Sequence, residues 1–391
     1  MRSIEKTGDH EVTVRLKKPD SMFNQYMAVS PGTIESAKTL AAAGKDYGNA
    51  SSGVNCTGPF QFDSWQQGEK ITLSRYDDYW DDDLRARSGK VEFVFLPDPN
   101  TRVNAWASGQ VDGGWMVPAN AFPQLRASDA GDLYYGENTS VTSEIVSDTS
   151  GILGDTRVRR ALLMATDRKG IVEAGEQGVA DVARSMVTAN TWLGVPDEKV
   201  QDHVESLPTY DHDLEAAKAL AKEAGVDGQR IVIATTPAFQ AADVITAAVA
   251  QAARDIGLDP KIETISPDKY TTLFSDPAAR KGIDLFLTNW YTSLADPMEF
   301  FGVLRTGQFS NYGAWSDPAF DTAALAALDA EVDHPKRVDD MAEADRIAME
   351  ELPWLPLYTA PTSMWLGDRI TGVQPSIAFL YYPLAATIGA K

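Results

Sequence analysis

TGPFQFDSWQQGEKITLSRYDDYW, residues 57–80, decides the fold together with VEFVFLPDPNTR at 91–102 and ASGQVD at 107–112. Gly58 and Pro59 are typical of a tight turn that leads into a strand. Polar and apolar residues alternate in KITLSR (70–75) and again in VEFVFL (91–96), as they do in strands with one buried face. The segment therefore predicts a half-buried sheet whose strands are joined by turns.

The chain has 391 residues, of which 43% are hydrophobic and 23% are charged, as in an ordinary globular protein. This length exceeds the usual size of one domain, so we expect two lobes. The formal net charge is −21. A surface of that charge repels nucleic acid and anionic membranes, so we expect neither as a partner.

The one cysteine, Cys56, excludes an internal disulfide, and a lone thiol cannot build a metal cluster. It lies directly before the Thr57 turn, so we expect a small buried core residue rather than a nucleophile. No recognisable motif surrounds any of the four histidines, which are His10, His203, His212 and His334. We therefore predict no metal site and no cofactor.

Beyond residue 140, predicted strands alternate with predicted helices. Val158, Ala161, Leu162 and Ala165 lie on one face of a helix that starts at Asp155. Strands are expected at 141–146, 230–235, 261–265 and 284–289, and helices at 214–224, 241–256, 317–330 and 335–351, with Asp333 as the N-cap of the last. This alternation predicts an α/β lobe with crossover connections.

Motifs of the common enzyme classes are absent from the sequence, which has no G-x-S-x-G elbow, no G-x-x-x-x-G-K-S/T loop, no H-E-x-x-H and no G-x-G-x-x-G. We predict a protein that is not an enzyme and has no catalytic residue. An acidic hydrolase that uses two carboxylates stays open, because 56 acidic residues always supply a candidate pair. DDYWDDD (77–83) lacks the order and the central glycine of an EF-hand loop, so a solvated acidic turn is expected there.

NWYTSLADP, residues 289–297, follows a predicted strand and is the best candidate for a binding site. Ligands of open α/β sheets gather beyond the carboxyl ends of strands. Trp290 and Tyr291 offer stacking surface there, and Thr292 and Ser293 offer hydrogen bonds. From the residues alone, an ordinary loop with Trp290 packed in the core is an equally good interpretation.

The order of these segments resembles that of the extracytoplasmic solute-binding proteins of ABC importers, in the family that binds dipeptides, oligopeptides and nickel. The shared pieces are the TGPF turn, the YW strand end, the DPN turn and the SGQVD helix end. DTRVRRAL (155–162) with ATDRKGI (165–171), and LPWLPLY (352–358), match further blocks of that family. The resemblance covers nearly all of residues 10–391.

The resemblance implies a two-lobed, periplasmic-binding-protein-like α/β fold of type II, in the large peptide-binding cluster, with a ligand cleft between the lobes. It divides the chain into a remnant of a small extra domain with a linker at 1–50, a first lobe at 51–147 plus 369–391, and a second lobe at 148–368. Family members begin earlier, so the first lobe is expected to be incomplete at its N-terminus. Arg157, Arg159 and Arg160 are expected to form salt bridges within the second lobe rather than to bind ligand.

The resemblance also selects the site residues. NWYTSLADP matches a family loop that lines the cleft, and in peptide-binding members an aspartate three residues after the tryptophan pairs with the α-amino group of the ligand. Ser293 stands at that position here, and a neutral hydroxyl lacks the charge for such a bond. The expected ligand-binding residues are Asn289, Trp290, Tyr291, Thr292, Ser293 and Asp296 in the second lobe, Asn138, Thr139 and Ser140 at the crossover into it, and Trp115 and Met116 in the first lobe.

The implied function is that of the substrate-binding component of an ABC importer. Such a protein captures a small solute, here peptide-like or another polar organic compound, and delivers it to membrane permease subunits. We expect a monomer in the periplasm or at the cell surface, although the chain starts without a signal peptide or a lipidation cysteine. A sensory receptor that feeds no transporter, and a degenerate fragment, are the alternatives within the same fold.

Overall fold

The computed structural model describes residues 1–331 and 335–391, which form two compact units. The large unit comprises residues 1–24 and 139–360, and the small unit comprises residues 25–138 and 361–391. The sequence led us to expect the changes of lobe at 147/148 and 368/369, whereas the chain changes unit at 138/139 and 360/361. The strand at 140–146 is the reason for the first difference, because it lies inside the sheet of the large unit.

The large unit is built around a six-stranded sheet with the order β11-β10-β12-β8-β13-β9. Its strands are β8 (Ser140–Val146), β9 (Asp181–Val182), β10 (Arg230–Thr235), β11 (Asp259–Thr264), β12 (Leu285–Tyr291) and β13 (Trp354–Thr359). β10 runs parallel to β11 and β12, and β8 runs antiparallel to both β12 and β13. All seven residues of β8 are buried, as expected of a strand between two neighbours with helices on both faces.

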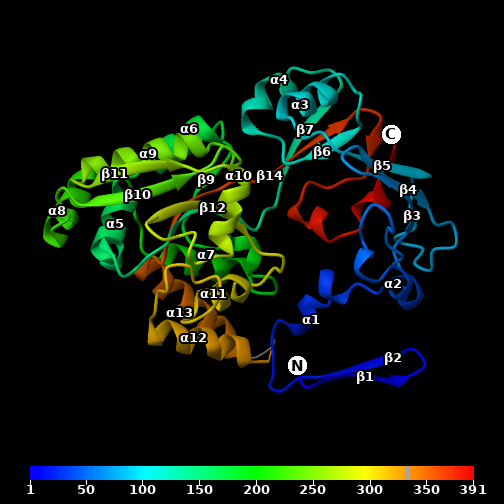
Figure 1. The fold of residues 1–391 in the computed structure, drawn as a ribbon, viewed down its shortest axis with the longest axis horizontal. Helices are drawn as coiled ribbons and strands as arrows, with labels where there is room; N and C mark the ends of the chain where they lie inside the picture. The colour runs from blue at the N-terminus through cyan, green and yellow to red at the C-terminus, as the bar shows by residue number, and fades with distance from the viewer. Residues whose placement is uncertain (332–334) are drawn as a thin grey trace. The chain divides into compact units, whose positions relative to one another are not determined.

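Helices cover both faces of this sheet (Figure 1). One layer contains α5 (Thr156–Ala165), α6 (Arg168–Gly175), α8 (Leu214–Ala224) and α9 (Ala242–Asp255), and the other contains α11 (Met298–Leu304), α12 (Pro318–Asp329) and α13 (Pro335–Glu351). The unit also contains the hairpin β1 (Ser3–Gly8) with β2 (Glu11–Arg15), α7 (Asp197–Ser206) and α10 (Pro267–Tyr270). The mixed sheet between helical layers confirms the predicted α/β fold. Asp333, the expected N-cap of α13, lies outside the described residues.

The small unit contains two three-stranded antiparallel sheets, with the orders β3-β4-β5 and β6-β14-β7. Their strands are β3 (Phe60–Gln66), β4 (Lys70–Arg75), β5 (Lys90–Val94), β6 (Gly113–Trp115), β7 (Gly131–Gly136) and β14 (Thr362–Gly367), and α3 (Pro99–Ala107) follows β5. Asp98 caps α3 by accepting a hydrogen bond from the amide of Thr101 at 2.7 Å. Residues 57–112 therefore form one sheet and the helix that leads to the second sheet.

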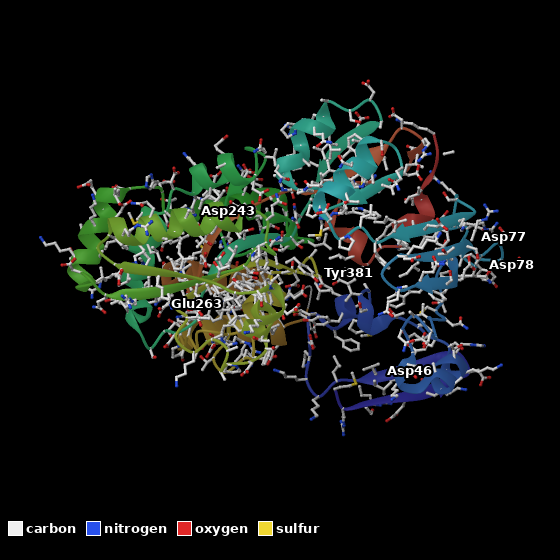
Figure 2. All side chains as sticks on the ribbon, turned by 45° about the horizontal axis from the view of Figure 1, so that its top comes forward. Asp46, Asp77, Asp78, Asp243, Glu263 and Tyr381 are labelled. Carbon is white, nitrogen blue, oxygen red and sulfur yellow. The ribbon has the colours of Figure 1, made fainter. Side chains whose placement is uncertain are left out.

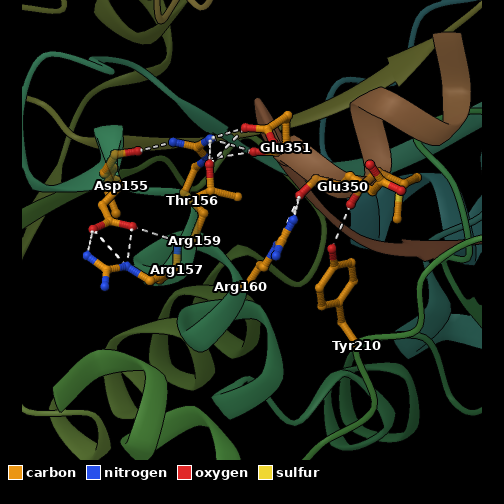
Figure 3. Close-up of polar contacts among 10 residues, drawn as sticks. Asp155, Thr156, Arg157, Arg159, Arg160, Tyr210, Glu350 and Glu351 are labelled. Atoms are coloured by element: carbon orange, nitrogen blue, oxygen red, sulfur yellow. Dashed lines mark hydrogen bonds and ion pairs between the residues drawn. The ribbon is translucent and has the colours of Figure 1, made fainter. Parts of the chain in front are cut away.

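The arginines of the DTRVRRAL block hold α5 to the end of α13 (Figure 3). Arg157 pairs with the N-cap residue Asp155 at 2.6 Å. Arg159, which is only 1% exposed, donates to the carbonyl oxygens of Leu153 and Glu351. Arg160 donates to the carbonyl of Glu350 at 2.6 Å. The arginines of α5 thus make contacts within the large unit. Arg159 and Arg160 donate mainly to main-chain oxygens, and Arg157 pairs with a carboxylate.

Two surface features bear on the sequence predictions. Cys56 is exposed, so the prediction of a buried core residue is wrong. Cys56 forms an isolated β-bridge with Glu35 at the border of an irregular segment, and its side chain is exposed to solvent there. Asp77 and Asp78 point outward from the turn after β4 (Figure 2), as a solvated acidic turn requires. Within residues 1–331 and 335–391, no helix is both long and apolar enough to cross a membrane.

Candidate functional site

Seven of the predicted site residues meet at one end of the large sheet. β12 ends at Tyr291, and its antiparallel pairing with β8 places Tyr291 opposite Ser140. One residue farther along, the hydroxyl of Thr139 donates to the carbonyl of Thr292 at 2.7 Å. The pairing therefore joins residues 289–293 to residues 139–140, which are about 150 positions away in the sequence.

β12 leaves the hydrophobic core after its fourth residue. Leu285, Phe286, Leu287 and Thr288 are buried, whereas Asn289 is exposed and Tyr291 is 45% exposed. Exposed and less exposed side chains alternate only in the last three residues of the strand, where the helical layers on the two faces of the sheet end. These residues therefore present the amide of Asn289 and the phenol of Tyr291 to solvent. Asn289 and Tyr291 thus place a polar and an aromatic side chain at the surface at this end of the sheet.

Trp290 lies between the site and the core. Its ring packs edge-on against Trp354 at 5.4 Å and against Phe300 at 6.1 Å. The indole Nε1 is nevertheless buried without a hydrogen-bond partner among the described residues, and so is the hydroxyl of Thr292. A buried donor of this kind normally costs about 1–3 kcal/mol. Two such donors within three residues are an exception that calls for an explanation.

Glu299 is a residue of this region that the sequence did not reveal. Its Oε2 accepts the amide of Leu294 at 2.6 Å, and both the amide and the hydroxyl of Ser293 also hydrogen-bond to this carboxylate. Burial raises the pKa of Glu299, and these hydrogen bonds oppose the rise. Because the Ser293 proton is directed at Glu299, the Ser293 oxygen keeps lone pairs that can accept a hydrogen bond from a ligand.

Asp296 has a structural task. Its side chain is 3% exposed and pairs with Arg337 of α13 at 2.6 Å, and its other oxygen accepts the amide of Met298 at 2.9 Å. A buried and fully partnered carboxylate fixes the loop to α13 and starts α11. We therefore leave Asp296 out of the binding site that we propose below.

The other three predicted residues belong to the small unit. Trp115 is the last residue of β6 and pairs with Met364 of β14. Met116 follows with a φ of +55° and is 67% exposed, and its amide donates to the carbonyl of Ser363 at 2.9 Å. A left-handed conformation is uncommon for a residue with a side chain. Asn138 is the half-buried last residue before the chain enters the large unit.

A second carboxyl that the sequence did not reveal lies in the middle of β8. Glu144 is completely buried, and neither of its side-chain oxygens has a hydrogen-bond partner among the described residues. Burial raises its pKa to about 8. It lies two positions from Thr142 and opposite Leu287, so the carboxyl is inside the sheet layer rather than at the strand end. Its environment keeps it protonated over most of the physiological range.

The sequence profile described as bacterial extracellular solute-binding proteins, family 5 Middle, matches residues 1–312 of this chain. The chain belongs to this family. The family consists of solute-binding proteins of ABC transporters, which are extracytoplasmic and are not enzymes. The predicted resemblance is thereby confirmed, and so is the periplasmic-binding-protein-like fold.

Known relatives and solved structures agree with this assignment. The oligopeptide-binding protein OppA of Bacillus subtilis is 24% identical over 409 residues, which cover 97% of this chain and 70% of OppA. The structure of DppA from Helicobacter pylori in complex with the peptide STSA superposes with a TM-score of 0.83 at 20% identity, covering 100% of this chain and 74% of DppA. AgaA from A. tumefaciens R10, in complex with agropinic acid, gives a TM-score of 0.80 at 21% identity, covering 100% of this chain and 77% of AgaA.

Proposed function

We propose that this protein is the substrate-binding component of an ABC importer and that it binds a small polar organic solute at the end of β12. The observation that carries the proposal is the pair of buried donors, Trp290 Nε1 and Thr292 Oγ1, beside the exposed Asn289 and Tyr291. Acceptor groups of a solute satisfy these donors once the loop after β12 adjusts around it. The cost of leaving them unpaired then favours the bound state.

Ser293 and Glu299 determine which polar group of the solute this site selects. A free carboxylate at position 293 would select an ammonium group, but the carboxylate here lies behind the serine and is occupied by main-chain and hydroxyl donors. The Ser293 oxygen accepts a neutral N–H or O–H group of the solute instead. We propose that the ligand is a polar organic compound whose recognition does not depend on a free α-amino terminus. The known partners of AgaA and DppA, agropinic acid and a peptide, show how widely ligands differ on this fold.

The other partners follow from the same role. We propose that the protein acts as a monomer outside the cytoplasm and delivers its solute to the permease subunits of a membrane transporter. Binding and release need no covalent chemistry, so this role requires no catalytic residue, metal or cofactor. The net charge of −21 disfavours direct association with an anionic lipid surface, so delivery depends on recognition of the permease itself.

Native mass spectrometry of the purified protein tests the proposal. We expect a one-to-one adduct of a small solute, which is released unchanged on denaturation and can then be identified. Tyr291→Ala should lose the adduct, and Tyr76→Ala, which removes a comparably exposed tyrosine from the small unit, should keep it. A solute that is converted to product during incubation would contradict the binding role. An adduct that both variants retain would contradict the site.

A further inference from the structure

Glu176 is a buried carboxylate of the large unit whose charge no cation compensates. It follows α6 directly and is 6% exposed. Its Oε1 accepts a hydrogen bond from the phenol of Tyr358 at 2.8 Å, and its Oε2 accepts one from the side-chain amide of Gln240 at 3.2 Å. No lysine, arginine or histidine in residues 1–331 and 335–391 forms an ion pair with it. Glutamate is almost never buried in this way unless its charge is paired.

The register of the sheet connects Glu176 to the proposed solute site. Asn289 of β12 lies opposite Thr142 of β8, and Thr142 lies opposite Tyr358 of β13. Side chains directly opposite one another on neighbouring strands share one face of the sheet, with Cβ atoms about 5 Å apart. The side chain of Thr142 hydrogen-bonds to the phenol of Tyr358, which in turn donates to Glu176. A row of polar side chains therefore leads from the exposed Asn289 across the sheet to Glu176.

Gln240 separates the carboxylate from solvent. It is exposed and lies in the loop before α9, which packs against α6 on the same face of the sheet (Figure 1). Its bond to Glu176, at 3.2 Å, is at the long end of the range for N–H···O hydrogen bonds. Exposed side chains change rotamer within nanoseconds. A ligand that offers a stronger donor can therefore displace Gln240 from Glu176 without a change in the fold.

Glu176 retains acceptor sites for such a donor. An ionised carboxylate has about four acceptor sites, and the bonds from Tyr358 and Gln240 use one on each oxygen. Burial raises the pKa of Glu176, the hydrogen bond from Tyr358 opposes the rise, and a bound cation would favour the ionised form further. Glu144 lies on the same face, two positions from Thr142, but burial keeps it protonated, so it adds no charge there. The unmet demand at this place is for one positive charge.

We propose that Glu176 is a specificity-determining residue of the solute site and that the solute carries an organic cation, for which a guanidinium group fits best. The guanidinium displaces Gln240 and donates one N–H to each oxygen of Glu176, and Tyr358 keeps the carboxylate oriented. A neutral polar group of the same molecule reaches Ser293. Asn289 and Ser293 are four positions apart, a span of at most about 14 Å, so one small molecule reaches both ends.

This inference rests on the proposed solute site and adds a charge requirement to it. The test is calorimetric titration of the purified chain with N-acetyl-L-argininamide and N-acetyl-L-citrullinamide. The two probes have nearly the same shape and no free α-amino group, and only the first is charged. We expect the arginine compound to bind roughly tenfold more tightly. Equal affinities, tighter binding of the citrulline compound, or binding of neither would overturn the inference, whereas native mass spectrometry tests the solute site without these probes.

Variants separate a direct contact from a general effect of charge. Glu176→Gln keeps the shape and an acceptor for Tyr358, and it should abolish the difference between the two probes while affinity for the citrulline compound stays unchanged. Glu173→Gln removes an exposed carboxylate from α6 and is the matched control that should retain the difference. Loss of the difference in both variants would overturn the direct contact.

Tyr291→Ala distinguishes this inference from the solute site itself. We expect this variant to bind both probes more weakly. If it does so and Glu176→Gln changes nothing, the solute site stands and the role of Glu176 is refuted. If Tyr291→Ala changes neither affinity and Glu176→Gln removes the difference between the probes, Glu176 binds the cation but the proposed solute site is wrong.

Discussion

Replacing Glu144 by Gln tests the energetic description of the large sheet. The pKa of this carboxyl rises from 4.5 to about 8 because it is completely buried, so the folded protein holds a proton that the unfolded chain releases above its own pKa. Unfolding between these two values therefore releases a proton, and rising pH favours the unfolded state. At about 1.4 kcal/mol for each unit of pH, the wild-type protein should lose about 4 kcal/mol of stability between pH 5 and pH 8 from this group alone.

Glu144→Gln keeps the shape of the side chain and removes the ionisation. We expect the variant to be close to the wild type at pH 5, where both side chains are neutral, and clearly more stable at pH 8. The assay is urea unfolding at several pH values, followed by tryptophan fluorescence. The difference between the two proteins is the relevant quantity, because the many surface carboxylates contribute equally to both. Parallel stability profiles for wild type and variant would refute a buried carboxyl with a raised pKa.

Four further predictions concern single contacts. Trp290→Phe should stabilise the ligand-free protein by about 1 kcal/mol, because it removes an unpaired buried N–H, and should weaken solute binding in calorimetric titrations. Arg337→Met should cost about 3–5 kcal/mol in chemical unfolding, since it leaves the Asp296 carboxylate buried and unpaired, and the double change with Asp296→Leu should recover most of the loss. Asp317→Ala should cost about 1 kcal/mol in the same assay, because Asp317 caps α12 by accepting the amide of Phe320 at 2.8 Å. Gly136→Ala should lower the midpoint of thermal unfolding, with a loss of about 2 kcal/mol, because a Cβ there would lie 1.8 Å from the carbonyl oxygen of Pro375.

The secondary structure that the sequence predicted well is the part determined by local patterns. The alternation in KITLSR gives β4 within its predicted limits, and α8 ends at residue 224 with Gly225 in the left-handed conformation at a φ of +71°. These features depend on neighbours in the sequence, so periodicity and glycine placement are sufficient to find them. The family assignment depended on the order of such local segments, and the match of the family profile to residues 1–312 confirmed it.

The site was only partly predictable because its decisive contacts join distant residues. Nothing near Asp296 in the sequence indicates that Arg337, 41 residues later, neutralises it. Glu299 reads as an ordinary first-turn acid of α11, and its contact with Ser293 appears only when the loop is folded. Glu144 stands in a strand of mixed polar and apolar residues, but β12 and β13 flank both edges of this strand and helices cover both faces of the sheet. The exposed Cys56 shows the reverse error, in which a typically buried residue lies where no layer covers it.

The central claim is that a small polar solute binds at the end of β12, and a crystal structure of the protein with the solute identified by mass spectrometry tests it most directly. We predict that the solute accepts hydrogen bonds from Trp290 Nε1 or Thr292 Oγ1, that it donates one to Ser293 Oγ, and that the Asp296–Arg337 pair is undisturbed. A solute that contacts none of residues 289–293, or whose ammonium group pairs directly with Asp296, would contradict the account.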